Sequence, residues 1–104
     1  MVNTKQLVRR VLEMAEELSG VKYRVKDGEL MVDAVKLAIE KALAEGEEVA
    51  LYGFGSFKVH EYPERTTNIH NKTYVIPPRK GVKFAPGKRL RREVAEGIFQ
   101  PFEL

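Results

Sequence analysis

The chain has 104 residues and a net charge of +3 at pH 7, and it is 43% hydrophobic and 32% charged. This length favours a single domain, and the composition is that of an ordered protein rather than a disordered one. No apolar run approaches the ~20 residues needed to span a membrane, and the N-terminus lacks the apolar core of a signal peptide. The absence of cysteine excludes disulfides and thiolate metal sites. We therefore expect a cytoplasmic protein that does not associate with a membrane.

The first predicted element is an amphipathic helix near the N-terminus. Apolar residues recur at helical spacing from Leu7 to Leu18. Either Asn3 or Thr4 can cap its N-terminus, because a short side-chain oxygen satisfies an otherwise unpaired amide. Ser19-Gly20 is expected to end the helix, since glycine suits the left-handed C-cap conformation.

A short link and a second helix follow. Val21 to Lys26 alternates apolar and basic residues, which predicts a brief strand or an extended connector, and Asp27-Gly28 predicts a turn or a cap. Helical periodicity returns at Glu29 and is expected to end at Gly46. The apolar stripe of this helix is wide and rich in alanine, so it needs a packing partner in addition to the first helix.

The next segment is expected to form a sheet. Val49 to Tyr52 predicts a strand, Gly53-Phe54-Gly55 a tight turn whose glycines adopt angles closed to other residues, and Ser56 to His60 the returning strand. Lys80 to Phe84 predicts a further short strand that returns to the body.

A hairpin is expected to project from this sheet. Its strands would run from about Glu61 to Thr67 and from Lys72 to Ile76, with residues 68–71 at the tip. Its apolar content is too low to pack a sheet face, so it should stand away from the body and be mobile until a partner orders it. At the tip, Ile69 is either a chance exposed apolar residue or a wedge for another molecule.

The last predicted element is a helix from Lys88 to about Ile98. Its first turns carry several cations, which oppose the helix macrodipole at an N-terminus, and phosphate contact would explain them. Beyond this helix, Phe99 and Phe102 are expected to fold back on the body or to frame the edge of a dimer.

Positive charge is concentrated in one part of the chain. Between Leu51 and Arg92 there are ten Lys or Arg against two acidic residues, a net +8, whereas residues 1–50 carry −2 and residues 93–104 carry −3. Charge segregated in this way indicates a polyanion-binding surface. The alternative is a solvated ribbon whose charges only prevent edge-to-edge aggregation.

Five stretches, spread over nearly the whole chain, form a recognisable set. They are Asn3-Thr4-Lys5-Gln6-Leu7, Gly53-Phe54-Gly55-Ser56-Phe57-Lys58-Val59, Glu64-Arg65-Thr66, Ile76-Pro77-Pro78 and Phe84-Ala85-Pro86-Gly87-Lys88-Arg89-Leu90. Together they resemble the bacterial HU and integration-host-factor (IHF) family of DNA-bending proteins.

The resemblance implies an α+β fold and an obligate, intertwined dimer, here expected to be a homodimer. Residues 1–104 would form one DNA-binding domain. In it, residues 1–48 would give the helical dimerisation base, residues 49–87 a β-sheet saddle with one protruding β-ribbon arm per subunit, and residues 88–104 a short C-terminal helix and tail. The implied partner is double-stranded DNA, with no cofactor, no metal and no small-molecule substrate.

HU and IHF are themselves standard examples of architectural proteins that insert into the minor groove and bend DNA. The residues that the resemblance places at the centre of the dimer are Phe54, Phe57 and Phe84. The DNA-binding residues that it implies are Lys5, Ser56, Lys58, Arg65, Asn68, Ile69, His70, Lys72, Arg79, Lys80, Lys83 and Lys88.

The chain departs from the family pattern in its arm and between its helices. The family wedges a proline at each arm tip between base pairs, and Ile69 aligns best with that proline, in a shorter arm; isoleucine is able to unstack a base step. Tyr62 stands where the family commonly has an arginine, so one arm contact is lost or becomes a stacking or hydroxyl contact. Extra residues fall between the helices, around Val21 to Asp27.

The leading hypothesis is a homodimeric architectural protein that bends DNA with little direct base readout, in a bacterial nucleoid or encoded by a phage. A second hypothesis is a scaffold of the same fold whose arms and tail contact proteins. A third is a binder of single strands or RNA in which Tyr62 and Tyr74 stack on bases. An enzyme is not expected, because His60 and His70 lack a nearby nucleophile or acid pair and should lie too far apart for a shared metal.

Overall fold

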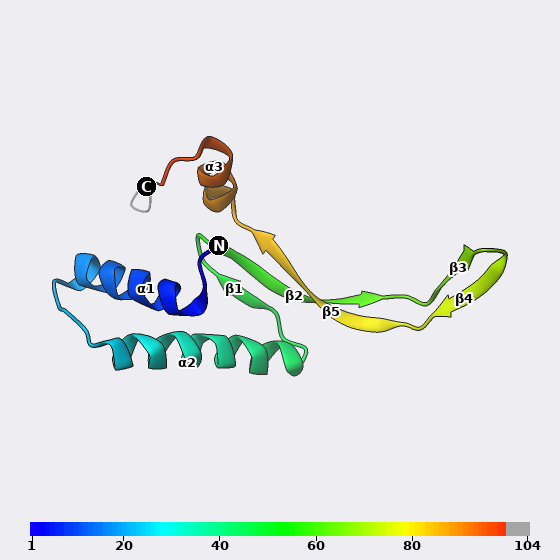
Figure 1. Ribbon diagram of the computed structural model, residues 1–104, viewed down its shortest axis with the longest axis horizontal. Coiled ribbons are helices and arrows are strands. Elements are labelled where there is room, and N and C mark those ends of the chain that lie inside the picture. Colours follow the sequence, from blue (N-terminus) through cyan, green and yellow to red (C-terminus); the bar gives the residue numbers. More distant parts are fainter. Residues whose placement is uncertain (100–104) are drawn as a thin grey trace. The chain divides into compact units, whose positions relative to one another are not determined.

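The computed structural model describes residues 1–99 and contains two compact units, one formed by residues 1–41 and the other by residues from 42 onward. Within residues 1–99, helices and antiparallel strands confirm the expected α+β class (Figure 1). The elements are α1 (Thr4–Ser19), α2 (Val25–Ala44), β1 (Val49–Leu51), β2 (Gly55–Tyr62), β3 (Arg65–Ile69), β4 (Lys72–Ile76), β5 (Arg79–Pro86) and α3 (Lys88–Glu96). Phe102, for which we expected a contact with the body or a partner, lies outside the described residues.

The ends of α1 follow the sequence signals closely. Asn3 is the N-cap: its side-chain oxygen accepts a hydrogen bond from the Gln6 amide at 2.9 Å, and the Asn3 amide donates to Gln6 Oε1 at 3.1 Å. This reciprocal pair is a capping box. Gly20 ends the helix at φ 72°, and its amide donates to the Glu16 carbonyl. Both predicted boundaries are confirmed.

The second helix begins earlier than the sequence predicted. α2 starts at Val25, so the expected connector ends at residue 24 and not at Lys26. Of the two alternatives for Asp27-Gly28, the turn is wrong and the cap is correct for Asp27. The Asp27 carboxylate accepts a hydrogen bond from the Arg24 amide at 3.2 Å and so caps the first turn. Gly28 is helical and buried. A Cβ at this position would lie 2.9 Å from the Leu12 side chain of α1, so only glycine fits without a shift. The glycine permits close helix packing and does not mark a turn.

Most apolar side chains of the helical unit are uncovered. Val8, which is 5% exposed, is the only buried apolar side chain within residues 1–99. Leu30, Met31 and Leu37 are each more than 60% exposed. An apolar surface of this extent on a small protein usually marks an interface. The second packing partner expected for α2 is therefore missing from a single chain.

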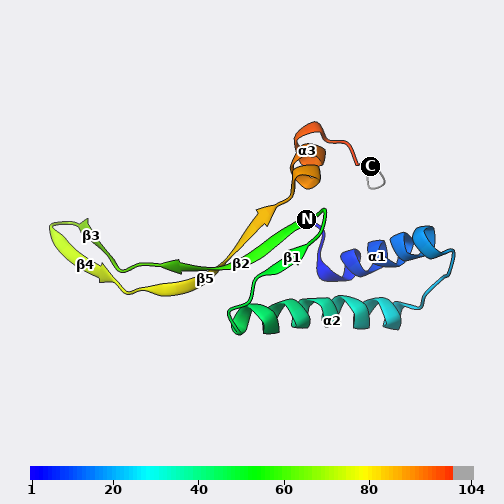
Figure 2. The ribbon, with the colours of Figure 1, turned by 180° about the vertical axis from the view of Figure 1, so that it is seen from behind.

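The strands form two antiparallel sheets, and a two-stranded ribbon runs from one into the other (Figures 1 and 2). β1, β2 and β5 form a three-stranded sheet in the order β1-β2-β5, and β3 pairs with β4. In both views β3 and β4 continue the ribbon that β2 and β5 begin (Figure 2). The projecting hairpin expected from the sequence is thus present, in two segments.

Prolines separate the two segments of the ribbon. The proximal segment, formed by β2 and β5, ends at the pair Tyr62–Arg79. The distal segment, formed by β3 and β4, begins at the pair Arg65–Ile76. Pro63 on one strand, and Pro77-Pro78 on the other, fall between them. Proline has no amide hydrogen to donate to a ladder. The continuous strand predicted from Glu61 to Thr67 was therefore wrong.

The tip of the arm is a two-residue turn. His70 and Asn71 have φ values of 52° and 63°, both in the left-handed region, as a type I′ hairpin turn requires. β3 continues through Ile69, which pairs with Lys72, so the tip is narrower than the predicted residues 68–71. The Thr73 hydroxyl donates to Asn68 Oδ1 at 2.8 Å and links the strands just before the turn.

Two of the recognisable motifs meet in space at the base of the sheet. Gly53 adopts φ 78°, and the Phe54 amide donates to the Leu51 carbonyl at 2.9 Å, which closes the predicted tight turn. The Gly87 amide, directly before α3, donates to the Phe54 carbonyl at 2.8 Å. α3 then runs to Glu96, slightly short of the predicted end. None of the helices described is long and apolar enough to cross a membrane.

Candidate nucleic-acid interface

The register of β2 and β5 sorts their side chains onto two faces. Paired residues share a face and successive residues alternate between faces. The face that we call the basic face carries Ser56, Lys58, His60 and Tyr62 of β2 with Ala85, Lys83, Gly81 and Arg79 of β5. The opposite face, which we call the apolar face, carries Gly55, Phe57, Val59 and Glu61 with Pro86, Phe84, Val82 and Lys80.

The basic face places like charges next to one another. Lys58 and Lys83 are direct cross-strand partners, an arrangement that destabilises a sheet. Glu48 relieves part of the repulsion through an exposed ion pair with Lys58, with Nζ and Oε1 3.7 Å apart. Surface pairs of this kind contribute little. The Lys58–Lys83 pair therefore costs stability in the free protein. A bound polyanion would remove this repulsion, which explains why the two lysines are placed together.

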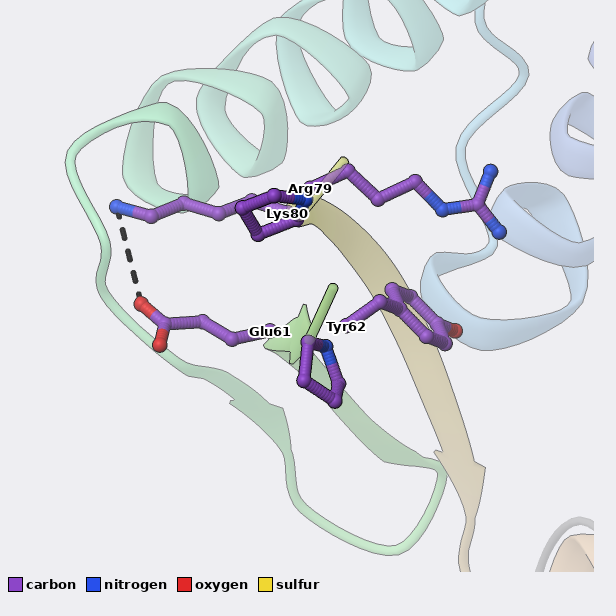
Figure 3. A pocket seen from close by; sticks show the side chains of 6 residues that line it. Glu61, Tyr62, Arg79 and Lys80 are labelled. Carbon is purple, nitrogen blue, oxygen red and sulfur yellow. Dashed lines mark ion pairs between the residues drawn. The ribbon is translucent and has the colours of Figure 1, made fainter. Parts of the chain in front are cut away.

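Lys80 is separated from the other predicted cations of this strand. Its side chain lies on the apolar face, where its ammonium is 4.0 Å from a Glu61 carboxylate oxygen. Figure 3 shows this pair on one side of the ribbon and Arg79 with Tyr62 on the other. The sequence could not separate Lys80 from Lys83, because both belong to one basic run.

The aromatic residues predicted for the dimer centre are brought together. The Phe84 ring lies 4.8 Å from the Phe57 ring and 5.7 Å from the Phe54 ring, measured between centroids. Phe54 is 43% exposed and Phe84 is 37% exposed. The cluster therefore lies at the surface of a single chain, with apolar rings available to a further layer.

A second cluster lies on the basic face at the end of the proximal segment. The Arg79 guanidinium lies over the Tyr62 ring, 5.0 Å from its centroid, and the His60 ring meets the same tyrosine edge-on with centroids 4.5 Å apart. Beside it, an open pocket of about 610 Å³ is lined by Pro63 and Pro78 and by the pairs Glu61–Lys80 and Tyr62–Arg79 (Figure 3). The sequence singled out both Tyr62 and Arg79, but it did not predict that the two side chains contact one another.

The distal segment also has two unlike faces. Arg65, Thr67 and Ile69 of β3 share a face with Ile76, Tyr74 and Lys72 of β4, whereas Thr66 and Asn68 lie with Val75 and Thr73 on the other. Both distal cations and Ile69, which is 50% exposed, are thus on one side. Asn68 is on the opposite side, and His70 is in the turn.

The two remaining predicted contacts lie outside the ribbon. Lys5 is in the first turn of α1, within the first compact unit, and is exposed. Lys88 is the first residue of α3, whose next residue, Arg89, forms an ion pair with Glu93 at 3.4 Å. Among residues 1–99 no group of three potential metal ligands occurs, and His60 and His70 lie in different segments of the ribbon.

Comparison with known proteins identifies relatives over almost the full chain. The family described as bacterial DNA-binding protein matches residues 2–95. The DNA-binding protein HU of Thermotoga maritima is 40% identical over 92 residues, which are 86% of this chain and 96% of the relative. An IHF beta subunit of Saccharophagus degradans is 38% identical over 95 residues, 89% of this chain and 92% of the relative.

The fold has solved counterparts as well. A cocrystal structure of Anabaena HU with DNA superposes with a TM-score of 0.75 at 32% identity, covering 89% of this chain and 97% of that one. HU from Thermotoga maritima superposes with a TM-score of 0.57 at 33% identity, covering 88% of this chain and 97% of that one.

These matches define the class of protein as the small DNA-binding architectural proteins of bacteria, not an enzyme. The chain belongs to the bacterial DNA-binding protein family, together with HU and IHF. The resemblance stated from its motifs is confirmed, as is the expectation that it does not belong to an enzyme family.

Proposed function

We propose that the chain acts as a homodimer that binds duplex DNA through phosphate contacts, inserts its arm tips into the minor groove and bends the duplex. The observation that carries this proposal is the segregation of charge between the two faces of the proximal segment. Lys58, Lys83 and Arg79 share the basic face, whereas Glu61, the one acid of these strands, lies on the apolar face. Apart from Glu48, which pairs with Lys58, the charges placed on this face are positive, and such a surface suits the phosphate backbone, which supplies most of the affinity of such proteins.

Dimerisation is supported by the apolar surface that one chain leaves open. Leucine and methionine side chains of α2 are more than 60% exposed, and the rings of Phe54 and Phe84 are 43% and 37% exposed. Exposed apolar side chains gathered in this way usually mark an interface. We place these groups in the subunit interface, so that residues 1–104 form one domain only when two chains are paired. The dimer would act on DNA in the bacterial cytoplasm.

The wild-type protein is expected to bind duplex DNA with strong salt dependence. If the three basic-face cations of each subunit contact phosphates, the logarithm of the association constant should fall with the logarithm of salt concentration with a slope of about −5 or steeper. Electrophoretic or fluorescence titrations at several salt concentrations measure this slope. Failure to bind duplex at low salt would overturn the proposal, and co-purification of a protein partner in that case would favour the scaffold hypothesis.

Replacing Ile69 with alanine is expected to reduce bending by more than it reduces affinity. Unstacking a base step requires an apolar wedge, and Ile69 is exposed at the end of β3 beside the turn. We expect the affinity to stay within about threefold, because the phosphate contacts remain. Energy transfer between dyes on the ends of a short duplex measures the bend.

Val75→Ala is the matched control for this variant, because Val75 is an exposed β-branched residue on the other face of the same segment. It should leave the bend unchanged. Equal bending by the Ile69→Ala variant and the wild type would exclude the wedge.

A further inference from the structure

The ring of Tyr62 lies over a glycine on the neighbouring strand. Gly81 pairs with His60, so Tyr62 is its diagonal neighbour on the basic face. A Cβ built on Gly81 would be 2.9 Å from Tyr62 Cε2 and 3.6 Å from Cδ2. The position of the ring therefore depends on the absence of a side chain at residue 81.

The other neighbours of the ring are the two polar side chains of the cluster. Arg79, the direct partner of Tyr62, lies over the ring with its guanidinium carbon 5.0 Å from the centroid. His60 meets the ring edge-on, with planes at 79° and centroids 4.5 Å apart. The tyrosine is thus held between Gly81 and His60, and it presents an aromatic surface to Arg79.

A cation–π contact restrains a guanidinium without using its hydrogen-bond donors. The guanidinium carbon of Arg79 lies over the Tyr62 ring, and the N–H groups of an arginine held in this way can still form a bidentate contact with a phosphate. Glu61, the one acid of β2 and β5, pairs with Lys80 on the apolar face. The ion pairs found within residues 1–99 do not include Arg79.

We infer that Tyr62 is a positioning residue that orients Arg79 on the basic face, so that the guanidinium meets a DNA phosphate at the last rung before the proline break. This inference rests on the proposed function and adds a specific device to it. Ordering a long side chain before binding lowers the entropy lost when the contact forms. A lysine at position 79 has no planar group that could be oriented in this way.

Tyr62→Leu is expected to lower affinity for a duplex by about tenfold when both arms of a dimer carry it, since a stack at an exposed site contributes a factor of a few per arm. Tyr62→Phe keeps the ring and should restore the wild-type affinity. Gly81→Ala should mimic Tyr62→Leu, because it displaces the ring while the tyrosine stays. Tyr52→Leu, at a fully exposed turn residue, is the matched control and should have no effect.

A double-variant cycle separates positioning from a structural role. Arg79→Lys should lower affinity by a similar factor, and Tyr62→Leu should then add less than about twofold in the Arg79→Lys background. Multiplicative losses in the double variant, equal losses for Tyr62→Phe and Tyr62→Leu, or an unchanged affinity of Tyr62→Leu would each overturn the inference. A wild-type protein that fails to bind duplex at low salt would instead remove the proposed function.

Discussion

Replacing both Lys58 and Lys83 by glutamine is expected to lower the affinity for duplex DNA by about three orders of magnitude at about 0.1 M salt. A dimer would lose four cations, and each phosphate contact contributes about 0.9 to the slope of log K against log salt, so the slope should become shallower by about 3.6. The folded protein should not be weakened, because the substitution also removes a like-charge pair that lies directly across the sheet. Salt titrations give the slope, and thermal unfolding checks the fold.

The matched comparison is Lys83→Gln against Lys80→Gln. Both remove one positive charge from the same strand, but Lys83 lies on the basic face and Lys80 on the apolar face beside Glu61. We expect Lys83→Gln to flatten the slope by about 1.8 in the dimer and Lys80→Gln to change it much less. Equal effects would mean that DNA contacts both faces of the ribbon, which would contradict the assignment made from the strand register.

Local signals were sufficient to predict the elements whose ends are set by their own residues. Asn3 and Gly20 bound α1 because capping depends on a few adjacent atoms. The turn at Gly53 and the start of α3 after Gly87 follow for the same reason. The motifs around Phe54 and Phe84 were sufficient for the family, and the structure brings these motifs into contact.

Features that depend on a distant residue could not be predicted in this way. Gly28 resembles a turn residue in the sequence, and only the packing of Leu12 against it shows why a helix contains glycine there. Lys80 and Lys83 are both cations of one run, and only the pairing with β2 places them on opposite faces. Tyr62 and Arg79 are far apart in sequence and form one unit because the register makes them partners.

Both faces of the ribbon use the same packing device, in which an aromatic ring covers a glycine on the adjacent strand. On the basic face Tyr62 covers Gly81, and on the apolar face the Phe84 ring covers Gly55. Gly55 does not have a left-handed φ. The tight-turn interpretation of both glycines is therefore correct for Gly53 only, and Gly55 is needed for space.

Gly55→Ala is accordingly expected to destabilise the protein by about 2 to 3 kcal/mol, since overpacking a well-packed site costs about 1 to 3 kcal/mol and here the obstacle includes backbone. A Cβ at this position would lie 2.7 Å from the Ala85 carbonyl oxygen and 2.7 Å from Phe84 Cζ. Neither can move without shifting β5 or the aromatic cluster. Because the same cluster is proposed to lie in the subunit interface, the variant should also shift the equilibrium toward monomers. Urea unfolding at a fixed protein concentration measures the first effect, and sedimentation equilibrium the second.

Ser56→Ala is the control, because Ser56 is the adjacent residue of β2 and lies on the basic face, away from the phenylalanine rings. The loss of a single hydroxyl there should leave the urea midpoint and the dimer mass almost unchanged. A Gly55→Ala protein with the wild-type midpoint would show that Phe84 does not press on this strand in solution. A destabilised variant that stays fully dimeric would separate the two roles of the cluster. In that case the rings would stabilise the fold of each chain, and the exposed side chains of α2 would supply the contacts that hold the subunits together.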